Sequence, residues 1–339
     1  MNEQHLMDRS RVLHEALEQI GWSDADAVVQ RVLRLDIGLP AEDEFAVICS
    51  WLGRCSLIHK LDQQQMPKSS REVYQVPDLL AVFETEHNQY KVLIEVKTSN
   101  KNILTLSAKH REKLIRYGEL LGIPVLFAWK YHEIWMLFDI SLFERFNKNY
   151  RIHWFDALSN SLMSVLAGDV GFQLGDGVGL HLTFSKDKLH CEEGDTQTWN
   201  TRIKDIYFLN YLGEKVYEMP SSTLSIIGCC ELDDDCVVDD ESIKQTFSVR
   251  SGVGYFAHKS LASLLKFRAP SAQDSIHWRS LLVDETPLHS FANFQKALDE
   301  ALHQKIVQLI LVQHPVIYPK FIKDNDKSPQ ALNGMDSKE

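Results

Sequence analysis

Three charged residues interrupt two apolar runs in the stretch VPDLLAVFETEHNQYKVLIEVKT, which spans residues 76–98. Asp78 opens the first run, whereas Glu95 and Lys97 lie within the second. Burying an unpaired charge costs several kcal/mol, so charges in such places are usually paired or bound to a cation. These three residues are therefore candidates for a single site.

A β-hairpin would bring the three side chains together. If its turn is centred between His87 and Asn88, cross-strand partners have residue numbers that sum to 175. Asp78 then faces Lys97 directly and lies diagonally from Glu95. Because side chains alternate along a strand, all three share one face of the sheet. Diagonal neighbours lie about 7–8 Å apart, a gap that one cation between two carboxylates can bridge.

The chemistry of this grouping suits a hard divalent cation. The carboxylates of Asp78 and Glu95, with the Val96 carbonyl and waters, form an oxygen-lined site for Mg²⁺ or Mn²⁺. Such a metal can activate water and stabilise charge on a phosphate under in-line attack, while Lys97 orients the nucleophile or neutralises that charge. The alternative is that Asp78 merely follows Pro77 in a turn, and that the other two residues point to solvent from an edge strand.

The surrounding sequence predicts the elements that must position this group. A helix begins near Pro40 and ends near Gly53, and the β-type runs LIHKL, LLAVF and KVLIEV follow. A second helix is expected from about Leu106 to Leu121, before the strand-like runs PVLFAW and EIWMLF. One helix, three strands, one helix and two strands predict an α/β unit around a mixed sheet.

The motif of Pro77, Asp78, Glu95 and Lys97 in this order of elements resembles the PD-(D/E)xK nuclease superfamily, which includes many restriction endonucleases and Holliday junction resolvases. The resemblance covers roughly residues 40–138, well under half of the chain. It implies a restriction-endonuclease-like α/β fold, a mixed sheet flanked by helices. It further implies that Asp78 and Glu95 are metal ligands, that Lys97 is the catalytic lysine, that Mg²⁺ or Mn²⁺ is the cofactor and that DNA is the substrate.

Members of this superfamily often carry a further acidic residue on the helix before the first strand. Glu44 is the candidate here, because it lies four residues before Ile48 at the edge of the apolar stripe of that helix. Glu42 and Asp43 are the alternatives. The sequence does not decide among these three carboxylates.

The second helix carries a basic stripe. Lys109, Lys113 and Arg116 lie on one of its faces, and Lys101 lies just upstream. This stripe could follow a phosphate backbone, although a solvated helix face would have the same pattern. Many superfamily members have a polar residue, often glutamine, on this helix, and the three basic residues stand in its place. The opposite face carries residues that can pack on the sheet, namely Leu114, Gly118 and Leu121.

Composition limits the class of protein. The chain has 339 residues, of which 44% are apolar and 24% charged, which is a globular composition with room for two domains. Its formal net charge of −11 means that any DNA-binding surface must be a local basic region. The cluster Cys229, Cys230 and Cys236 lacks the CxxC pair of a zinc site. The apolar run at 306–312 is too short to span a bilayer, so we expect a soluble cytoplasmic protein.

We expect four parts along the chain. They are an N-terminal helical segment (1–39), a nuclease core (40–145), a C-terminal α+β accessory domain (146–322) and a disordered tail (323–339). Within the accessory domain, GFQLGDGVGLHLTF predicts a hairpin that turns at Gly175–Gly177. The stretch ELDDDCVVDDE is expected to be an irregular, solvated acidic region, because it lacks the spacing of a calcium loop.

The favoured hypothesis is a metal-dependent DNA endonuclease acting in defence, restriction or recombination. One alternative is a binding or scaffold module that keeps the nuclease fold without catalysis. Another is a nuclease subunit that is active only in a larger complex. A homodimer, or a larger complex formed through the acidic C-terminal domain, is also consistent with the sequence.

Overall fold

The computed structural model describes residues 41–62, 67–194, 196–250, 252–268, 281 and 294–327. The expected N-terminal helical segment lies outside these residues, as does the end of the expected tail. The described chain forms two compact units, and the first holds the described residues up to Asp169, those of Arg268–Pro287 and those from Val312 onward. The second holds Val170–Phe267 and the described part of Leu288–Leu311. The chain thus leaves the first unit and returns to it.

The first unit is built on a five-stranded sheet. Its principal elements after the helical residues 41–52 are β1 (Cys55–Lys60), α3 (Lys68–Val73), β2 (Leu79–Glu84), β3 (Gln89–Thr98), β4 (Ile103–Ser107), α4 (Ala108–Leu121), β5 (Val125–Tyr131) and β6 (Ile134–Asp139). The strands lie in the order β1-β2-β3-β5-β6; β3 and β5 are parallel, and the other neighbouring pairs are antiparallel. The predicted mixed sheet with a restriction-endonuclease-like fold is confirmed.

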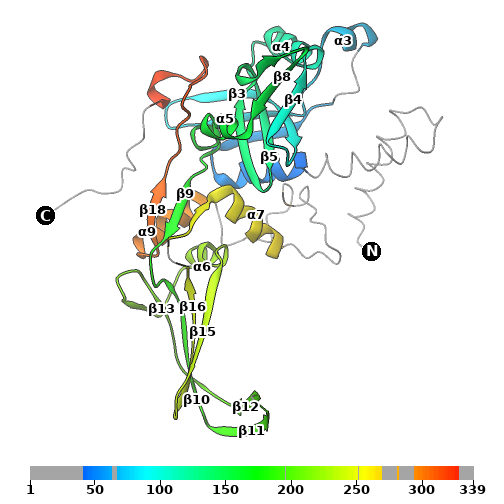
Figure 1. Cartoon of the computed structure of the whole chain (residues 1–339). Coiled ribbons are helices and arrows are strands. Elements are labelled where there is room, and N and C mark those ends of the chain that lie inside the picture. Colours follow the sequence, from blue (N-terminus) through cyan, green and yellow to red (C-terminus); the bar gives the residue numbers. More distant parts are fainter. Residues whose placement is uncertain are drawn as a thin grey trace, which may run out of the picture. The chain divides into compact units, whose positions relative to one another are not determined.

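Two layers cover this sheet (Figure 1). On one face, which we term the α4 face, Phe127 and Trp129 pack with Leu114 of α4 and with residues of β4. On the other face the ring centroid of Phe45, from the 41–52 helix, lies 4.9 Å from that of Trp135. Strand β3 lies between β2 and β5 and is buried along most of its length. Charged residues on β3 therefore lie in an interior strand.

The first unit continues past the expected boundary at residue 145. Its remaining elements are η1 (Ile140–Leu142), β7 (Glu144–Phe146), β8 (Asn149–His153), α5 (Trp154–Ser159), the π-helical turn η2 (Met163–Ala167) and η4 (Asp324–Asp326). Strands β4, β8 and β7 form a small antiparallel sheet of their own. Because β8 pairs with β4, residues beyond 145 complete the packing of the nuclease-like sheet.

The returning segment closes the first unit. The amide of Val316 donates to the Ser159 carbonyl at 3.0 Å. Asp326 is buried, and its Oδ2 accepts hydrogen bonds from the Tyr90 hydroxyl at 2.5 Å and from Asn88 Nδ2 at 2.6 Å. The expectation that a disordered tail begins at residue 323 is therefore wrong for residues 323–327, because Asp326 is bonded to the β2–β3 hairpin.

The second unit is an α+β assembly with three sheets. Its elements are β9 (Gly171–Leu174), β10 (Gly179–Ser185), β11 (Lys188–Glu193), β12 (Thr196–Asn200), β13 (Ile203–Leu209), β14 (Lys215–Val216), α6 (Ser221–Gly228), β15 (Leu232–Val238), β16 (Ser242–Val249), β17 (Gly254–Phe256), α7 (Ala257–Arg268), α9 (Phe294–His303) and β18 (Val307–Leu311). The largest sheet has the order β14-β13-β10-β16-β15, and β17-β9-β18 and β11-β12 form smaller sheets (Figure 1).

Two expectations for this unit are wrong. Strands β9 and β10 do not pair as a hairpin, because β9 pairs with β17 and β18 whereas β10 pairs with β13 and β16. Gly179 permits the close approach of β16, since a Cβ there would collide with the Phe247 backbone. The acidic stretch is also not irregular, because Leu232–Val238 forms the edge strand β15.

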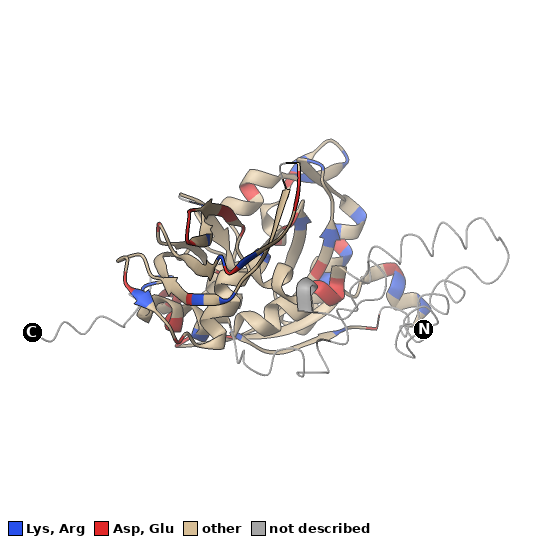
Figure 2. Ribbon diagram, turned by 90° about the horizontal axis from the view of Figure 1, so that it is seen from below, with Lys and Arg blue, Asp and Glu red and all other residues tan. Residues whose placement is uncertain are grey.

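Charged residues of both signs are interspersed along the ribbon (Figure 2). Among the residues that the structure describes, no helix has both the length and the apolar character needed to cross a bilayer.

Candidate active site

The β2–β3 hairpin brings Asp78 and Glu95 opposite each other. Leu79 pairs with Ile94 in the antiparallel ladder, so the same register continued by one residue places Asp78 against Glu95. The expected register, in which Asp78 faced Lys97, is wrong by two residues. The turn lies at 85–88, where the Thr85 amide donates to the Asn88 carbonyl at 2.9 Å. A shift of two residues preserves the face, so the two carboxylates still share the α4 face.

Asp78 is held by the backbone of the next strand. Its Oδ2 accepts a hydrogen bond from the Val96 amide at 2.7 Å, and the residue is only 9% exposed. Burial and the neighbouring Glu95 charge raise the pKa of Asp78 to about 8, despite the opposing effects of Lys97 and the Val96 amide. The protein alone therefore disfavours two adjacent carboxylate charges.

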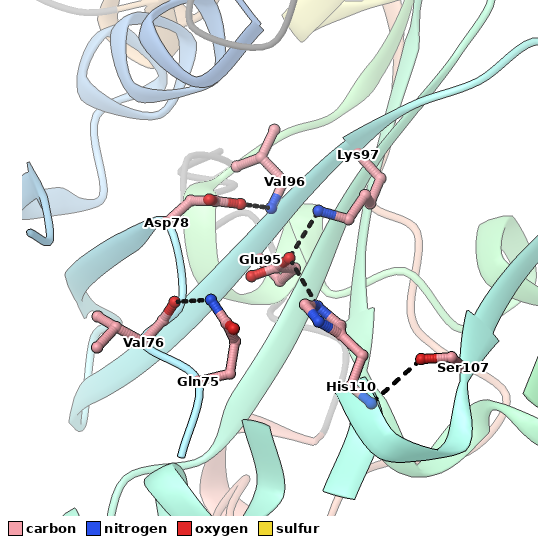
Figure 3. A network of polar contacts seen from close by, with 8 residues as sticks. All are labelled: Gln75, Val76, Asp78, Glu95, Val96, Lys97, Ser107 and His110. Atoms are coloured by element: carbon pink, nitrogen blue, oxygen red, sulfur yellow. Dashed lines mark hydrogen bonds and ion pairs between the residues drawn. The ribbon is translucent and has the colours of Figure 1, made fainter. Parts of the chain in front are cut away.

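Glu95 is the most buried member of the group, and Figure 3 shows its polar contacts. Its Oε1 accepts from Lys97 Nζ at 2.6 Å and contacts His110 Nε2 at 3.1 Å. Its Oε2 is buried and has no hydrogen-bond partner among the residues that the structure describes. Burial raises the pKa of Glu95, but Lys97 and His110 outweigh that effect, so its pKa lies below the usual value. A buried carboxylate oxygen without a partner points to a ligand.

Lys97 completes the charged group. Burial lowers the pKa of Lys97, but the neighbouring charges of Glu95 and Asp78 raise it by more than burial lowers it, so the ammonium stays protonated. Its side chain is 38% exposed. Lys97 therefore joins the buried carboxylate to the solvent-facing side of the site, where a substrate could approach.

His110 is the site residue that the sequence analysis missed. It lies in the first turn of α4, where its amide donates to the capping hydroxyl of Ser107 at 3.2 Å. It lies four and eight residues before Leu114 and Gly118, the two buried residues of α4, so it is on the sheet-facing side. The spacing of His110 from Leu114 and Gly118 could therefore have identified it as a site candidate from the sequence. His110 occupies the helix on which the resemblance leads us to expect a polar residue.

The donors fit a divalent cation that keeps several waters. Asp78 and the free Oε2 of Glu95 offer two carboxylates on one face, and Mg²⁺ is commonly bound by one or two carboxylates with waters filling the remaining positions. The described residues contain no cluster of three or more His, Cys, Asp or Glu side chains suited to a metal. For Val96 the structure shows the amide bound to Asp78; ligation by its carbonyl stays a prediction.

The three acidic candidates of the 41–52 helix, Glu42, Asp43 and Glu44, have different partners. Glu44 accepts from Lys130 Nζ at 2.7 Å and from Trp135 Nε1 at 3.2 Å. Lys130 follows Trp129 on β5, so its side chain lies on the face opposite to Glu95. The structure thus does not bring Glu44 into the group.

Glu42 is the acidic residue that interacts with the group. Its charge contributes to raising the pKa of both Asp78 and Lys97. Burial raises the pKa of Glu42 itself, and Lys60 opposes that rise. Lys60 Nζ lies 2.9 Å from both Glu42 and Asp43, and Asp43 thereby has a partner of its own. Glu42 replaces Glu44 as the candidate for a third carboxylate.

The basic stripe of α4 is only partly available. Lys101 and Lys109 are exposed, Arg116 is paired with Glu112 at 2.5 Å, and the Lys113 ammonium donates to the Arg71 carbonyl. These residues lie outside the hydrogen-bonded group around Glu95. DNA binding by them stays a prediction.

The mixed sheet of the first unit, with Asp78 and Glu95 on one face, resembles that of the PD-(D/E)xK nucleases. Residues 65–166 match the model of a family described as archaeal Holliday junction resolvase (Hjc), which belongs to this superfamily. This segment includes Asp78, Glu95, Lys97 and His110 but is under a third of the chain. The resemblance expected from the sequence is confirmed for it, and the match supports a nuclease as the class of protein.

One solved structure that matches is described as Hjc, a Holliday junction resolvase from the archaeal hyperthermophile Archaeoglobus fulgidus. The match has 23% sequence identity and a TM-score of 0.29, and covers 34% of this chain and 88% of that one. A comparison with curated proteins found no match.

Proposed function

We propose that the protein is a metal-dependent endonuclease that hydrolyses DNA phosphodiester bonds. The observation that carries the proposal is the unpartnered, buried Oε2 of Glu95, on the same face as Asp78 and beside Lys97. The family match favours recombination over defence or restriction, and it makes branched DNA the first substrate to test.

The residues of the chain have separate tasks in this proposal. A divalent cation held by Asp78 and Glu95 would supply the Lewis-acid chemistry that activates water and stabilises charge on the phosphate. The Val96 amide fixes the Asp78 carboxylate, and His110 and Lys97 fix Oε1 of Glu95 so that Oε2 remains free. The Lys97 ammonium, which reaches solvent, can contact the phosphate and offset its developing charge.

Cleavage assays on the full chain test the proposal. Supercoiled, linear, single-stranded and four-way-junction DNA, with an RNA duplex, would be incubated with Mg²⁺, Mn²⁺ or EDTA. We expect metal-dependent cleavage of DNA that is abolished by EDTA and is fastest on the junction. The Glu44→Gln variant is a matched control, because Glu44 is a carboxylate of the 41–52 helix that binds Lys130 on the opposite face of the same sheet. Absence of cleavage on every substrate with either metal would reject the proposal.

A non-catalytic scaffold is the second candidate. It is favoured by the Lys97–Glu95 ion pair, which a purely structural role would also explain. In a scaffold the charges would stabilise the fold whether or not metal is present. The metal dependence of the stability of the site variants, described in the Discussion, separates the two roles.

A further inference from the structure

The small sheet β4-β8-β7 of the first unit has one buried side and one more exposed side. The buried side chains, Leu104, Leu106 and Ile152, pack with the core around Trp129. Because side chains alternate along a strand, the positions between them lie on the other side, which we term the outer face. On β7 and β8 the register assigns to the outer face Glu144, Phe146, Asn149, Arg151 and His153.

Exposed aromatic rings lie at both ends of β8. Phe146, next to the start of β8, is 48% exposed, and the Arg151 guanidinium carbon lies 3.8 Å from the centroid of its ring. Just past the end of β8, Phe155 is 59% exposed and packs edge-on against Trp154, with the centroids 5.9 Å apart. Trp154 in turn stacks on Tyr131 with the centroids 5.4 Å apart. Planar groups held in place by such neighbours can stack on nucleobases.

The rings at the end of β8 are connected to the loop that follows Lys97. The Tyr131 hydroxyl donates to Asn102 Oδ1 at 2.6 Å. Trp129, which is the partner of Lys97 in the β3–β5 ladder, donates its ring N–H to the Ser99 carbonyl at 3.0 Å. The loop between β3 and β4 therefore joins these rings to the candidate active site.

The other end of the small sheet also leads to the site. Strand β4 ends at Ser107, whose hydroxyl caps α4, and His110 in the first turn of α4 lies 3.1 Å from Glu95 Oε1. In the register of the sheet, Ser107 pairs with Asn149, and Asn149 pairs with Phe146. Both exposed rings are thus linked to residues of the site by short connections within the same unit.

The charges around the two rings favour a polyanion. The hairpin of β7 and β8 carries three basic residues and one acidic residue, namely Arg145, Lys148, Arg151 and Glu144. Lys101 in the loop after β3 is also exposed, and Asp156 on α5 is a second acidic neighbour. Basic residues thus outnumber acidic ones here, although the whole chain has a formal net charge of −11. Single-stranded nucleic acids bind where basic groups follow the backbone and aromatic rings stack on the bases.

We infer that the outer face, with the rings of Phe146 and Phe155, binds unpaired nucleotides of a DNA strand beside the active site. The bases stack on the rings, and Arg151 and its basic neighbours contact the phosphates. Asn149 and His153 are four residues apart, about 13 Å along the strand, and the aromatic residues of a nucleic-acid-binding sheet can stack two or three bases. The inference rests on the proposed function and narrows its substrate to branched DNA with an unpaired segment at the branch.

The two rings can be removed one at a time. Phe146→Ala and Phe155→Ala each delete one exposed aromatic side chain. Because both side chains are about half exposed, both variants should fold, which circular dichroism and thermal melting verify. Tyr217→Ala is the matched control, because Tyr217 is an aromatic residue of the second unit that is 63% exposed.

Fluorescence anisotropy in EDTA measures the binding of a short oligothymidine and of the same strand built from abasic residues. We expect the full-length wild type to bind oligothymidine at least about 10-fold more tightly than the abasic strand. Each phenylalanine variant should weaken oligothymidine binding by roughly 5-fold or more and leave binding of the abasic strand unchanged. Tyr217→Ala should behave as the wild type. Equal affinity of the wild type for both strands, or equal losses on both strands in the variants, would overturn the inference.

The inference and the proposed function fail separately in this design. Base-dependent binding by a protein that cuts no DNA with either metal would overturn only the proposed function. Metal-dependent cleavage by a protein that binds oligothymidine and the abasic strand alike would overturn only the inference about unpaired nucleotides.

Discussion

Strands β3 and β15 both carry acidic residues among apolar ones, yet the fold gives these residues different properties. Glu95 lies on an interior strand and is only 3% exposed; burial raises its pKa, but Lys97 and His110 together lower it below the usual value. Asp233 lies on an edge strand, exposed to solvent, where a hydrogen bond from Arg250 lowers its pKa. Edge strands commonly carry charges that prevent unwanted pairing. The position of a strand in its sheet therefore decides whether its carboxylates indicate chemistry or solubility.

The largest difference between the two strands should appear on removing one carboxylate of the site. Asp78→Asn should lower the rate of metal-dependent cleavage by roughly 10³-fold or more. It should also remove most of the stabilisation that Mn²⁺ gives to the fold. Asp234→Asn, on β15, should leave both unchanged. Cleavage rates and thermal melts with Mn²⁺ and with EDTA measure the two effects; metal-stabilised Asp78→Asn protein would count against ligation by Asp78.

The lysine of the site should affect turnover more than metal binding. Lys97→Ala should lower the cleavage rate by roughly 10²–10³-fold while Mn²⁺ still raises the melting temperature, because the carboxylates remain. Lys91→Ala, an exposed position on the same strand, is the control. If Lys97→Ala and Asp78→Asn instead destabilise the protein equally and regardless of metal, the group is a structural ion pair and the scaffold alternative holds.

His110 should have a smaller effect, through the orientation of Glu95. We expect His110→Ala to weaken metal affinity by about 10–100-fold, as loss of a residue that orients a metal ligand generally does. His110→Gln, which keeps a donor on the same turn of α4, should restore most of the affinity. Titration of Mn²⁺ into the two variants measures this difference, and equal affinities for Ala and Gln would remove His110 from the site.

Removing a basic side chain of the α4 stripe should have a smaller effect, on DNA affinity. Lys109→Ala should weaken DNA binding several-fold and reduce the slope of log affinity against log salt by about one unit, if Lys109 contacts one phosphate. Arg116→Ala should do less, since Glu112 already pairs with Arg116. Binding isotherms at several salt concentrations decide the matter. An unchanged slope for both variants would identify the stripe as a solvated helix face.

The pH dependence of stability tests the raised pKa of Asp78. The pKa of Asp78 is raised from 3.8 to about 8, so the folded protein binds a proton that the unfolded chain releases between these values. In EDTA this contribution to stability is complete below pH 3.8 and is lost as the pH rises towards about 8. Asp78→Asn should lack this loss. Urea unfolding of both proteins at pH 5 and at pH 8 provides the comparison.

The local part of the fold could be predicted because its signals are local. Alternating and continuous apolar runs indicated β2, β3, β5 and β6, and the shared face of Asp78 and Glu95 follows from the period of two in a strand. The register was missed by two residues because Thr85, rather than the polar His87 and Asn88 alone, sets the turn through its amide and side chain.

What could not be predicted depends on contacts between residues distant in sequence. Glu44 lies outside the site because Lys130 and Trp135, about ninety residues later, bind it on the far face. Glycines at 175 and 177 suggested a hairpin, but the partners of β9 come from β17 and β18. His110 could have been predicted from the sequence, because a polar residue on the packed side of an amphipathic helix needs a partner.

The hydrogen bonds of Asp326 determine when, during synthesis, the hairpin of the site can form all of its contacts. Asn88 and Tyr90 lie on the hairpin that carries the site, and the carboxylate that binds them is more than two hundred residues further along. During synthesis from the N-terminus, the whole second unit must be made before Asp326 can reach the hairpin. A nascent chain that stops before residue 312 therefore lacks the segment whose Asp326 forms hydrogen bonds with the β2–β3 hairpin. The nuclease-like unit is therefore completed only by residues that leave the ribosome after those of the second unit.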